Sequence, residues 1–444
     1  MSTTKNNNHD NDTGDDDQAT SENSMKQSSA ITTTPNNEDT LVIVAGDIGG
    51  TNSRLALYTS NGERVYYRDY RNEEYLLKDA DDDTTPSDRM FEQKILIPFL
   101  QSCCSEGRSS TTYDWNVFEI VVVCLAVAGP VKDNTVQTSR HKALEINGYD
   151  LLQRCQNSDD PFIRKIVQCC IINDFVAQGY GCLTLQNDDD VVELGVMSGS
   201  TNQTNQKTKN ENGPIVCIGA GTGLGTCYLT TTGPAALSSD SNSTATTTRT
   251  TSNYTCLPSE LGQIEWTPRT EHEIDLWRYL KQKLDSPNRV SLEEVVSGTG
   301  LANCYDGYAA LYPQKVTPSI QEQCNTAGDI KGMVVAEHAD DCEVCHMAMT
   351  TVMRSYGAAA STCAMTFLPT GGLYISGGLA PKHYLSSWIQ GSNSCFLTAY
   401  RDKGRASSIL NDIPLFVVTC DDLGLRGAYQ YARQQIYQHN CSNN

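Results

Sequence analysis

Apolar residues in this chain gather into short continuous runs separated by polar stretches, and the runs predict an alternation of strands and helices. Long apolar runs that end in glycine or in a polar pair are typical of buried strands. By this criterion, buried strands are expected at 41–46, 118–128, 166–172 and 214–219. Shorter strands are expected at 53–58, 226–229, 373–376 and 414–419. Strands mixed with helices on this scale indicate an α/β fold.

Helices are expected in the segments between these strands, chiefly in the second half of the chain. The ranges are 175–183, 271–284, 292–312, 334–367 and 425–437. Residues 1–40 are acidic and rich in Asn, Ser and Thr, and polar stretches recur near 198–213 and 230–253. Such segments bury too little apolar surface to offset the entropy lost on ordering, so we expect a disordered tail and two loop insertions.

The composition excludes several classes of protein. The 444 residues carry a formal net charge of −20, which argues against a nucleic-acid binder and against an anchor on anionic membrane. The longest apolar run, 120–129, is too short for a membrane span, which needs about 20 residues. The chain has 18 cysteines, but its opening residues are polar and acidic, unlike a signal peptide. We therefore expect reduced thiols and a cytoplasmic location, with an organelle left open.

The first candidate for chemistry is the string Gly46-Asp47-Ile48-Gly49-Gly50-Thr51-Asn52, which lies between two expected strands. A glycine pair in a tight turn lets the backbone approach an anion closely. Asp47 is a hard oxygen ligand of the kind that Mg²⁺ prefers. An isolated Gly-Gly would be an ordinary turn, but the whole string is more specific.

The second candidate is the run from Gly219 to Gly225, Gly-Ala-Gly-Thr-Gly-Leu-Gly, which also follows a buried strand. Its spacing is neither that of the dinucleotide motif G-x-G-x-x-G nor that of a Walker A loop. Two glycine turns that each contain Thr favour one polyphosphate held from two sides. The alternative is a flexible hairpin.

The third candidate is the pair Asn173-Asp174 at the end of an apolar strand. Asn and Asp are unfavourable inside strands, so the pair marks a strand end. A carboxylate there can accept a proton from a hydroxyl group. The alternative is a cap of the following helix, and the two roles are compatible.

These strings together resemble the bacterial-type glucokinases of the actin/hexokinase/Hsp70 phosphotransferase superfamily. The matching segments follow the family order and extend over 41–433. They are Gly46 to Asn52, Ala126 to Val131, Ile172 to Phe175, Gly219 to Gly225, Ser259 to Gln263, Glu293 to Leu301, Ser376 to Pro381 and Leu423 to Ala428. The polar tail and insertions suggest a eukaryotic member, protist or algal.

The resemblance implies a two-lobed actin-like ATPase fold, of the ribonuclease H-like class, with an interlobe cleft. It implies a small α/β domain at 41–183, a large α/β domain at 184–426 and a C-terminal helix at 427–444 that returns to the small domain. Glucose and ATP would be the partners, Mg²⁺ a cofactor, and a homodimer is common among relatives.

The resemblance also assigns roles to residues. Asp174 is the expected general base that takes the proton from the glucose 6-hydroxyl. The expected sugar ligands are Asn173, Asp174, Glu260, Gln263, Glu293 and, more weakly, Ser139. The expected ATP ligands are Asp47, Gly49, Gly50, Thr51, Asn52, Gly221, Thr222, Gly223, Gly377 and Gly378. Asp47 is the expected Mg²⁺ residue, acting through water.

The chain departs from the family pattern at Gln263, where the family usually has His, and at Ser139, where many relatives have Asn. Gln cannot titrate near neutral pH, so sugar affinity or anomer preference is in question. The rival functions are another kinase or a hydrolase of the same superfamily, or a hexose sensor without turnover. The string Cys342-Glu343-Val344-Cys345-His346 has the spacing of haem attachment, but we expect cysteines that pack one helix face.

Overall fold

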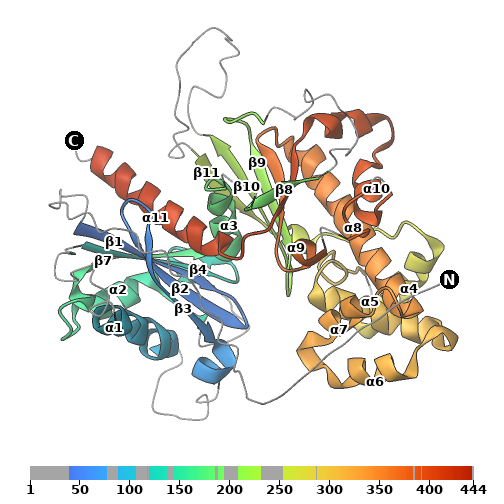
Figure 1. The fold of residues 1–444 in the computed structure, drawn as a ribbon, viewed down its shortest axis with the longest axis horizontal. Coiled ribbons are helices and arrows are strands. Elements are labelled where there is room, and N and C mark those ends of the chain that lie inside the picture. The colour runs from blue at the N-terminus through green and yellow to red at the C-terminus, as the bar shows by residue number, and fades with distance from the viewer. Residues whose placement is uncertain are drawn as a thin grey trace, which may run out of the picture. The chain divides into compact units, whose positions relative to one another are not determined.

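The computed structural model describes residues 40–77, 89–106, 118, 120–137, 144–185, 189–194, 209–231, 254–286, 288–383, 386–391 and 393–442. The expected tail lies outside these residues, apart from Thr40, and so does most of each expected insertion. Within the described residues, helices flank two large sheets (Figure 1).

The first sheet contains five strands in the order β3-β2-β1-β4-β7. They are β1 (Leu41–Ile48), β2 (Asn52–Thr59), β3 (Arg64–Arg71), β4 (Ile120–Val127) and β7 (Ile166–Asn173). The first three form an antiparallel meander, and β4 and β7 continue the sheet parallel to β1. The carboxyl ends of β1, β4 and β7 therefore meet at one edge. A small hairpin, β5 (Val131–Lys132) with β6 (Thr135–Val136), follows β4.

Alternate residues of β1 pack against opposite layers. Val42 and Val44 belong to a buried cluster with side chains of α1 (Ile97–Glu106) and α2 (Gly148–Gln156). Ile43 and Ala45 belong to another cluster with side chains of α11 (Leu423–Ser442). Figure 1 shows α11 on one side of this sheet and α1 and α2 on the other. Because both faces are covered, this strand is a continuous apolar run rather than an alternating one.

The second sheet has six strands in the order β11-β10-β9-β12-β13-β8. They are β8 (Val191–Glu193), β9 (Ile215–Ala220), β10 (Leu224–Thr231), β11 (Tyr254–Ser259), β12 (Gly372–Ser376) and β13 (Leu415–Val418). Strands β9 to β11 form an antiparallel meander, and β12 and β13 run parallel to β9. The second sheet thus repeats the arrangement of the first and adds β8 at its edge.

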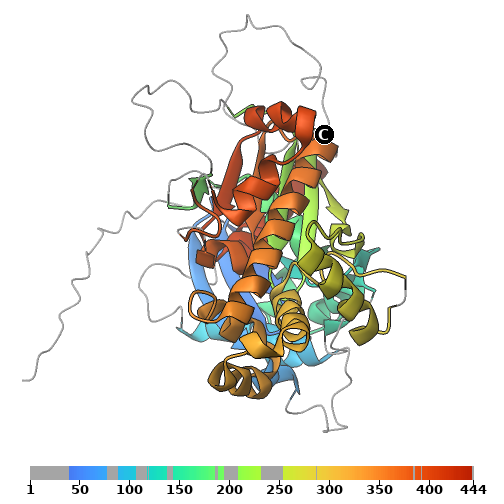
Figure 2. The same cartoon turned by 90° about the vertical axis from the view of Figure 1, so that its right-hand side faces the viewer.

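Helices cover both faces of the second sheet. They are α3 (Asp174–Cys182), α4 (Glu271–Lys283), α5 (Gly298–Leu311), α6 (Pro318–Thr326), α7 (Lys331–Glu337), α8 (Glu343–Phe367), α9 (Leu379–His383) and α10 (Cys395–Arg401). Val216 and Ile218 share a cluster with α5 and α8, whereas Ile215 and Cys217 share one with α3. Figures 1 and 2 show α4 to α8 grouped together beside this sheet.

Helices α3 and α11 pack with their backbones in contact. A β-carbon placed on Gly427 would lie 1.6 Å from the carbonyl oxygen of Ala177, and one on Gly181 would lie 2.3 Å from that of Leu423. Helix α11 also contacts β1 and β4, and α3 also contacts β9, β10 and β11. This helix pair therefore connects the two sheets.

The strands expected from apolar runs are confirmed, and two expected helices need correction. The helix expected at 292–312 begins only at Gly298, because the Ser297 hydroxyl caps it by accepting from the Gly300 N–H at 2.8 Å. The helix expected at 334–367 is two helices, α7 and α8, separated at residues 338–342. Strand β3 was not predicted, since its residues are mostly polar and exposed.

Candidate active site

Asp174 begins helix α3 directly after strand β7, as the apolar run before it predicted. Asn173 caps the helix, and its side-chain oxygen accepts from the N–H groups of Phe175 at 2.9 Å and Val176 at 3.2 Å. The Asn173 amide donates to Asp174 Oδ1 at 2.9 Å and to the Gly129 carbonyl at 2.9 Å. Capping is thus confirmed, and it leaves the Asp174 carboxylate at the strand edge.

The surroundings of Asp174 weaken its acidity. Loss of hydration is the largest cause and the charge of Asp47 the second, and together they raise the pKa of Asp174 to about 7. Hydrogen bonds from Phe175 and Asn173 oppose the rise. A carboxyl group with this pKa changes protonation near neutral pH, which is what a general base needs.

Asp47 lies near the end of β1, at the same sheet edge. Strand β4 lies between Asp47 and Asn173, because Asp47 pairs with Ala126 and Asn173 pairs with Val127. Burial raises the pKa of the Asp47 carboxyl, and Arg54, whose Nη1 is 3.8 Å from Asp47 Oδ2, lowers it. The carboxylates of Asp47 and Asp174 are therefore close enough for an electrostatic interaction.

Asp47 suits Mg²⁺ only as a partial ligand. Among the described residues, no group of three or more His, Cys, Asp or Glu side chains can hold a metal ion. Mg²⁺ in phosphate-transfer sites is usually held by one or two carboxylates, water and substrate phosphates. A lone carboxylate beside a glycine turn fits that type of site.

The first glycine turn joins β1 to β2 and contains Gly49, Gly50 and Thr51, with Asn52 as the first residue of β2. The Gly49 N–H donates to the Asn52 carbonyl at 2.9 Å and closes the turn. A β-carbon on Gly50 would have no contact within 4 Å, so the backbone there is open to a ligand. Asn72, to which the sequence analysis assigned no role, donates hydrogen bonds to the carbonyls of Gly49 and Gly50 in this turn.

The second glycine turn joins β9 to β10. The Gly221 N–H donates to the Gly223 carbonyl at 2.8 Å, and the Gly221 carbonyl accepts from the N–H of Gly298 at 2.8 Å. Thr299 Oγ1 donates to the Thr222 carbonyl at 3.3 Å. The start of helix α5 therefore supports this turn.

Glu293 also supports the second turn. Its Oε2 accepts from the Leu224 N–H at 2.8 Å, and a β-carbon on Gly223 would lie 2.5 Å from the same oxygen. The Glu293 N–H donates to the Gly262 carbonyl at 2.9 Å. One predicted sugar residue thus contacts both the second glycine turn and the segment that holds Glu260 and Gln263.

Glu260 and Gln263 flank a short 3₁₀ turn at Leu261–Gln263, and both side chains are exposed. The Gln263 N–H donates to the Glu260 carbonyl at 3.0 Å, and Arg289 donates to the Gln263 carbonyl at 2.8 Å. Ser139 lies outside the described residues, so its predicted role stays a prediction.

Gly377 and Gly378 follow β12, next to the end of β9. Gly377 has φ +80°, and a β-carbon there would lie 2.5 Å from the Ala220 carbonyl oxygen. Only glycine fits such a position without strain. The buried Tyr356 hydroxyl fixes the same corner, because it accepts from the Ala220 N–H at 3.1 Å and donates to the Ser376 carbonyl at 3.3 Å. These two predicted ATP ligands and the second glycine turn therefore lie side by side.

Phe175 connects Asp174 to the second turn, and the sequence analysis assigned it no role. A β-carbon on Gly225 would lie 1.9 Å from the Phe175 ring, and one on Gly219 would lie 3.0 Å from it. The ring thus packs on both strands at the base of the turn. A phenylalanine directly after the pair Asn173-Asp174 was the available signal.

The Cys342-x-x-Cys345-His346 string belongs to the core. Cys342 and Cys345 are buried in the large hydrophobic cluster around α8. His346 Nδ1 bonds the Ala339 carbonyl at 3.1 Å, and its ring packs against Trp388. These contacts confirm that the cysteines pack a helix face.

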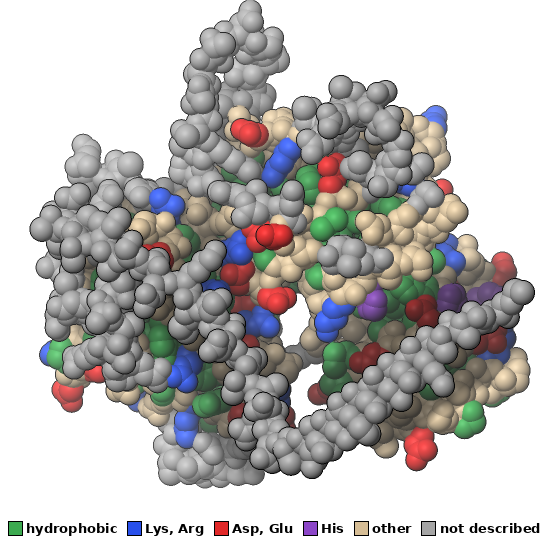
Figure 3. Space-filling model, in the orientation of Figure 1, with side chains coloured by type: hydrophobic (Ala, Val, Ile, Leu, Met, Phe, Trp, Pro, Cys, Tyr) green, Lys and Arg blue, Asp and Glu red, His purple; other side chains and the backbone are tan. Residues whose placement is uncertain are grey.

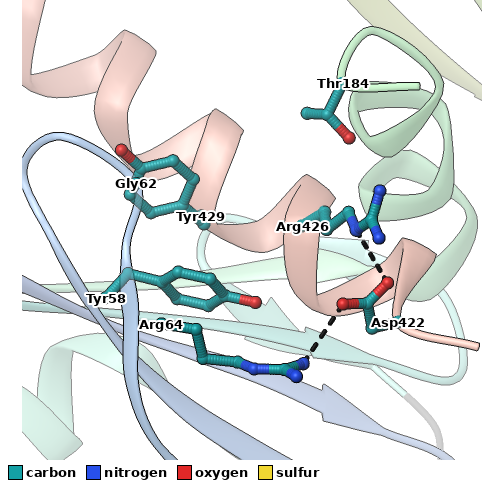
Figure 4. Close-up of a pocket in the computed structure, with 7 residues that line it drawn as sticks. All are labelled: Tyr58, Gly62, Arg64, Thr184, Asp422, Arg426 and Tyr429. Carbon is teal, nitrogen blue, oxygen red and sulfur yellow. Dashed lines mark hydrogen bonds and ion pairs between the residues drawn. The ribbon is translucent and has the colours of Figure 1, made fainter. Parts of the chain in front are cut away.

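A pocket of about 330 Å³ lies near the start of α11 (Figure 4). It is lined by Tyr58, Gly62, Arg64, Thr184, Asp422, Arg426 and Tyr429. Asp422 lies 3.1 Å from Arg64 Nη1 and 2.7 Å from Arg426 Nε, and Arg426 Nη1 lies 2.9 Å from Asp190. Its charges are thus paired with one another, and no predicted site residue lines it.

The surface shown in Figure 3 has a mixed charge. Basic side chains of the described residues stand singly among acidic ones on this face. This face therefore offers no extended cationic surface among the residues that the structure describes. In the same part of the chain, no helix has the length and apolar character needed to cross a membrane.

Comparison with known proteins places this geometry in a family. The family model described as Glucokinase matches residues 44–435. The chain belongs to the glucokinase family. A glucokinase of Synechocystis sp. is 30% identical over 409 residues, covering 88% of this chain and 98% of the relative. One of Trichormus variabilis is 30% identical over 400 residues, covering 87% and 97%.

Solved glucokinases share the fold. A glucokinase from an Antarctic psychrotroph superposes with a TM-score of 0.52 and 24% identity, covering 88% of this chain and 98% of its own. The glucokinase of Balamuthia mandrillaris, solved in complex with glucose, gives a TM-score of 0.57 with 18% identity, covering 88% and 93%. The expected two-lobed α/β fold of the glucokinase family is thereby confirmed.

Proposed function

We propose that this chain transfers the γ-phosphoryl group of ATP to the 6-hydroxyl of glucose, with Asp174 as the general base. The hydroxyl oxygen forms a bond to the γ-phosphorus while the bond from that phosphorus to the leaving ADP oxygen breaks. The hydroxyl proton passes to the Asp174 carboxylate. The products are glucose 6-phosphate and ADP, and membership of the glucokinase family supports this substrate pair.

The position of Asp174 carries the proposal. Its carboxylate lies at the sheet edge that also holds Asp47, and the ring of the next residue, Phe175, packs against the base of the second glycine turn. Phosphoryl transfer needs alignment and charge neutralisation more than covalent help from the protein. If the two glycine turns hold the phosphates of ATP, a base at this sheet edge would receive the proton as the new bond forms.

The glycine turns are the proposed ATP site. Gly49, Gly50, Thr51 and Asn52 would hold phosphates from one side, and the Gly221–Gly223 turn would hold them from the other. Gly377 and Gly378 would contact the adenosine. Asp47 would hold Mg²⁺ through water, and the ion would neutralise phosphate charge when bound.

The proposed glucose ligands are Asn173, Asp174, Glu260, Gln263 and Glu293. Asn173 adjoins the base, and Glu293 joins the second turn to the segment of Glu260 and Gln263. A carboxylate can accept two hydroxyl hydrogen bonds with charge-assisted strength, which suits a sugar. A homodimer and a cytoplasmic location remain predictions from the sequence.

The test is a coupled assay for glucose 6-phosphate with Asp174→Asn and Asp174→Ala beside the wild type. Loss of a general base is expected to lower kcat by about 10²–10⁴-fold, while glucose binding is kept. In the wild type, kcat/KM should rise with pH through about 7, since only the ionised carboxylate accepts a proton. Asp174→Asn should lack this rise.

Two results would contradict the proposal. One is glucose binding by the wild type without any turnover, which would favour a sensor. The other is full activity of Asp174→Asn with an unchanged pH profile, which would assign the base to another group. Turnover of mannose, fructose or glucosamine in preference to glucose would favour another sugar kinase.

A further inference from the structure

We infer that Asn72 is a positioning residue that holds the first glycine turn in the conformation that binds the phosphates of ATP. This inference rests on the proposed function, because it assigns that turn to ATP. Asn72 comes directly after β3, whose last residue, Arg71, pairs with Asn52 at the start of β2. The meander thus brings Asn72 behind the turn.

The Asn72 side chain bonds the turn at several points. Its Nδ2 donates to the carbonyls of Gly49 at 2.8 Å and Gly50 at 3.1 Å. Its backbone N–H donates to the Thr51 carbonyl at 2.9 Å. Its Oδ1 accepts from the Ser53 hydroxyl at 2.6 Å, which fixes the orientation of the amide. One residue therefore holds three successive carbonyl groups.

The orientation of these carbonyls determines that of the amides. In a trans peptide unit the C=O of one residue and the N–H of the next point in opposite directions. Carbonyls of Gly49 and Gly50 that face Asn72 therefore turn the N–H groups of Gly50 and Thr51 away from it. Successive N–H groups directed to one side form a concave anion site.

Asn72 acts through the turn and does not itself bind the nucleotide. It is 1% exposed, and its partner Ser53 is fully buried. Without its amide, the Gly49 and Gly50 carbonyls lose their partners and are free to rotate toward the phosphates, whose charge they would repel. The turn would then have to be rearranged each time ATP binds, which preorganised donors avoid.

The experiment compares Asn72→Ala and Asn72→Asp with the wild type, using the full chain. Calorimetry measures the binding of MgATP and of glucose separately, and the coupled assay gives kcat and KM. A small misplacement of a binding group can cost about 100-fold, so kcat/KM for ATP should fall by about that factor in Asn72→Ala. Asn72→Asp keeps the shape but removes the donor, and it should lose at least as much. Glucose affinity should stay as in the wild type.

Two further variants separate positioning from stability. Ser53→Ala leaves the two Nδ2 contacts and should cause a smaller loss of ATP affinity. Gln434→Ala removes another buried amide, which is 4% exposed and donates to the Tyr254 carbonyl at 2.9 Å. It should lower the melting temperature without changing either affinity.

Unchanged ATP affinity in Asn72→Ala would overturn the inference. So would an equal loss of ATP and glucose affinity that follows the drop in melting temperature. If the wild type fails to phosphorylate glucose, the proposed function fails, and the MgATP titration still decides the role of Asn72.

Discussion

The two sheets are built alike, but their glycine turns are held in different ways. Each sheet has an antiparallel meander of three strands followed by two parallel strands, and each turn joins the first two strands of its meander. The first turn is held by Asn72, which directly follows the third strand of the same meander. The second turn is held by Glu293 and by Gly298 and Thr299 at the start of α5.

The two turns therefore differ in whether a predicted sugar residue helps to hold them. The first turn is fixed inside its own sheet, so its shape does not depend on the proposed sugar residues. The second turn shares a hydrogen bond with Glu293, one of those residues. We therefore expect changes at the first turn to affect ATP alone, and changes at the second turn to affect both substrates.

The largest effect on stability should come from crowding the base of the second turn. Gly225→Ala would bring a β-carbon 1.9 Å from the Phe175 ring. The ring must move, and overpacking of this kind costs about 1–3 kcal/mol of stability. Because Asp174 adjoins Phe175, kcat should also fall. Urea unfolding and the coupled assay measure the two effects.

A second change tests the cause of that loss. Phe175→Leu removes the ring, so Gly225→Ala should be less harmful in the Phe175→Leu background than alone. A double-mutant cycle reports this interaction directly. Strictly additive losses would show that the two residues do not meet as the structure has them.

A smaller effect is expected for Glu293→Gln. The amide keeps an acceptor for the Leu224 N–H but loses the charge, and charge-assisted hydrogen bonds are stronger by about 1 kcal/mol. The catalytic efficiency for both substrates should fall by several-fold, whereas Asn72→Ala should affect ATP alone. Glu294→Gln is the control, because the Glu294 carboxylate accepts from Asn303 instead. Loss of glucose affinity alone would separate Glu293 from the phosphate turn.

The smallest effect is expected for Gln263→His, which restores the residue usual in the family. Gln263 is exposed, so stability should change by less than about 0.5 kcal/mol. Relative to the wild type, the KM for glucose should gain an additional pH dependence near the pKa of histidine, about 6.5. Identical glucose titrations of both proteins at several pH values would contradict a contact between residue 263 and the sugar.

Much of the fold could be predicted because burial leaves a strong pattern. Strands β1, β4, β7 and β9 are covered on both faces, and their apolar runs located them in the sequence. Strand β3 carries mostly exposed Arg, Asp and Tyr residues, so it has no apolar run that would predict a strand. It forms because its backbone pairs with β2. The break between α7 and α8 lies at residues 338–342, where the buried Ala339 and Cys342 continue the apolar pattern of the two helices, so the pattern did not reveal it.

Prediction of the site is limited in the same way, because contacts between distant segments leave no pattern in the sequence. Asp174 and the glycine turns stand in short distinctive strings, so they were found. Asn72 stands alone in a polar segment, and its role depends on hydrogen bonds to three carbonyls that are distant from it in sequence. Phe175 resembles any core residue until Gly225 is known to lie beneath it. Such contacts exist only after the sheets have formed.

The glycines between α3 and α11 have a mechanical consequence. Helix α3 starts at Asp174, and a β-carbon on Gly424, at the start of α11, would lie 2.8 Å from the Asp47 carboxylate. One carboxylate therefore begins α3 and the other contacts the start of α11, and the two helices meet with Gly181 and Gly427 at their closest backbone contacts. A side chain added at Gly427 would push α11 away from α3, and that displacement would reach Asp174 through α3 and Asp47 through Gly424.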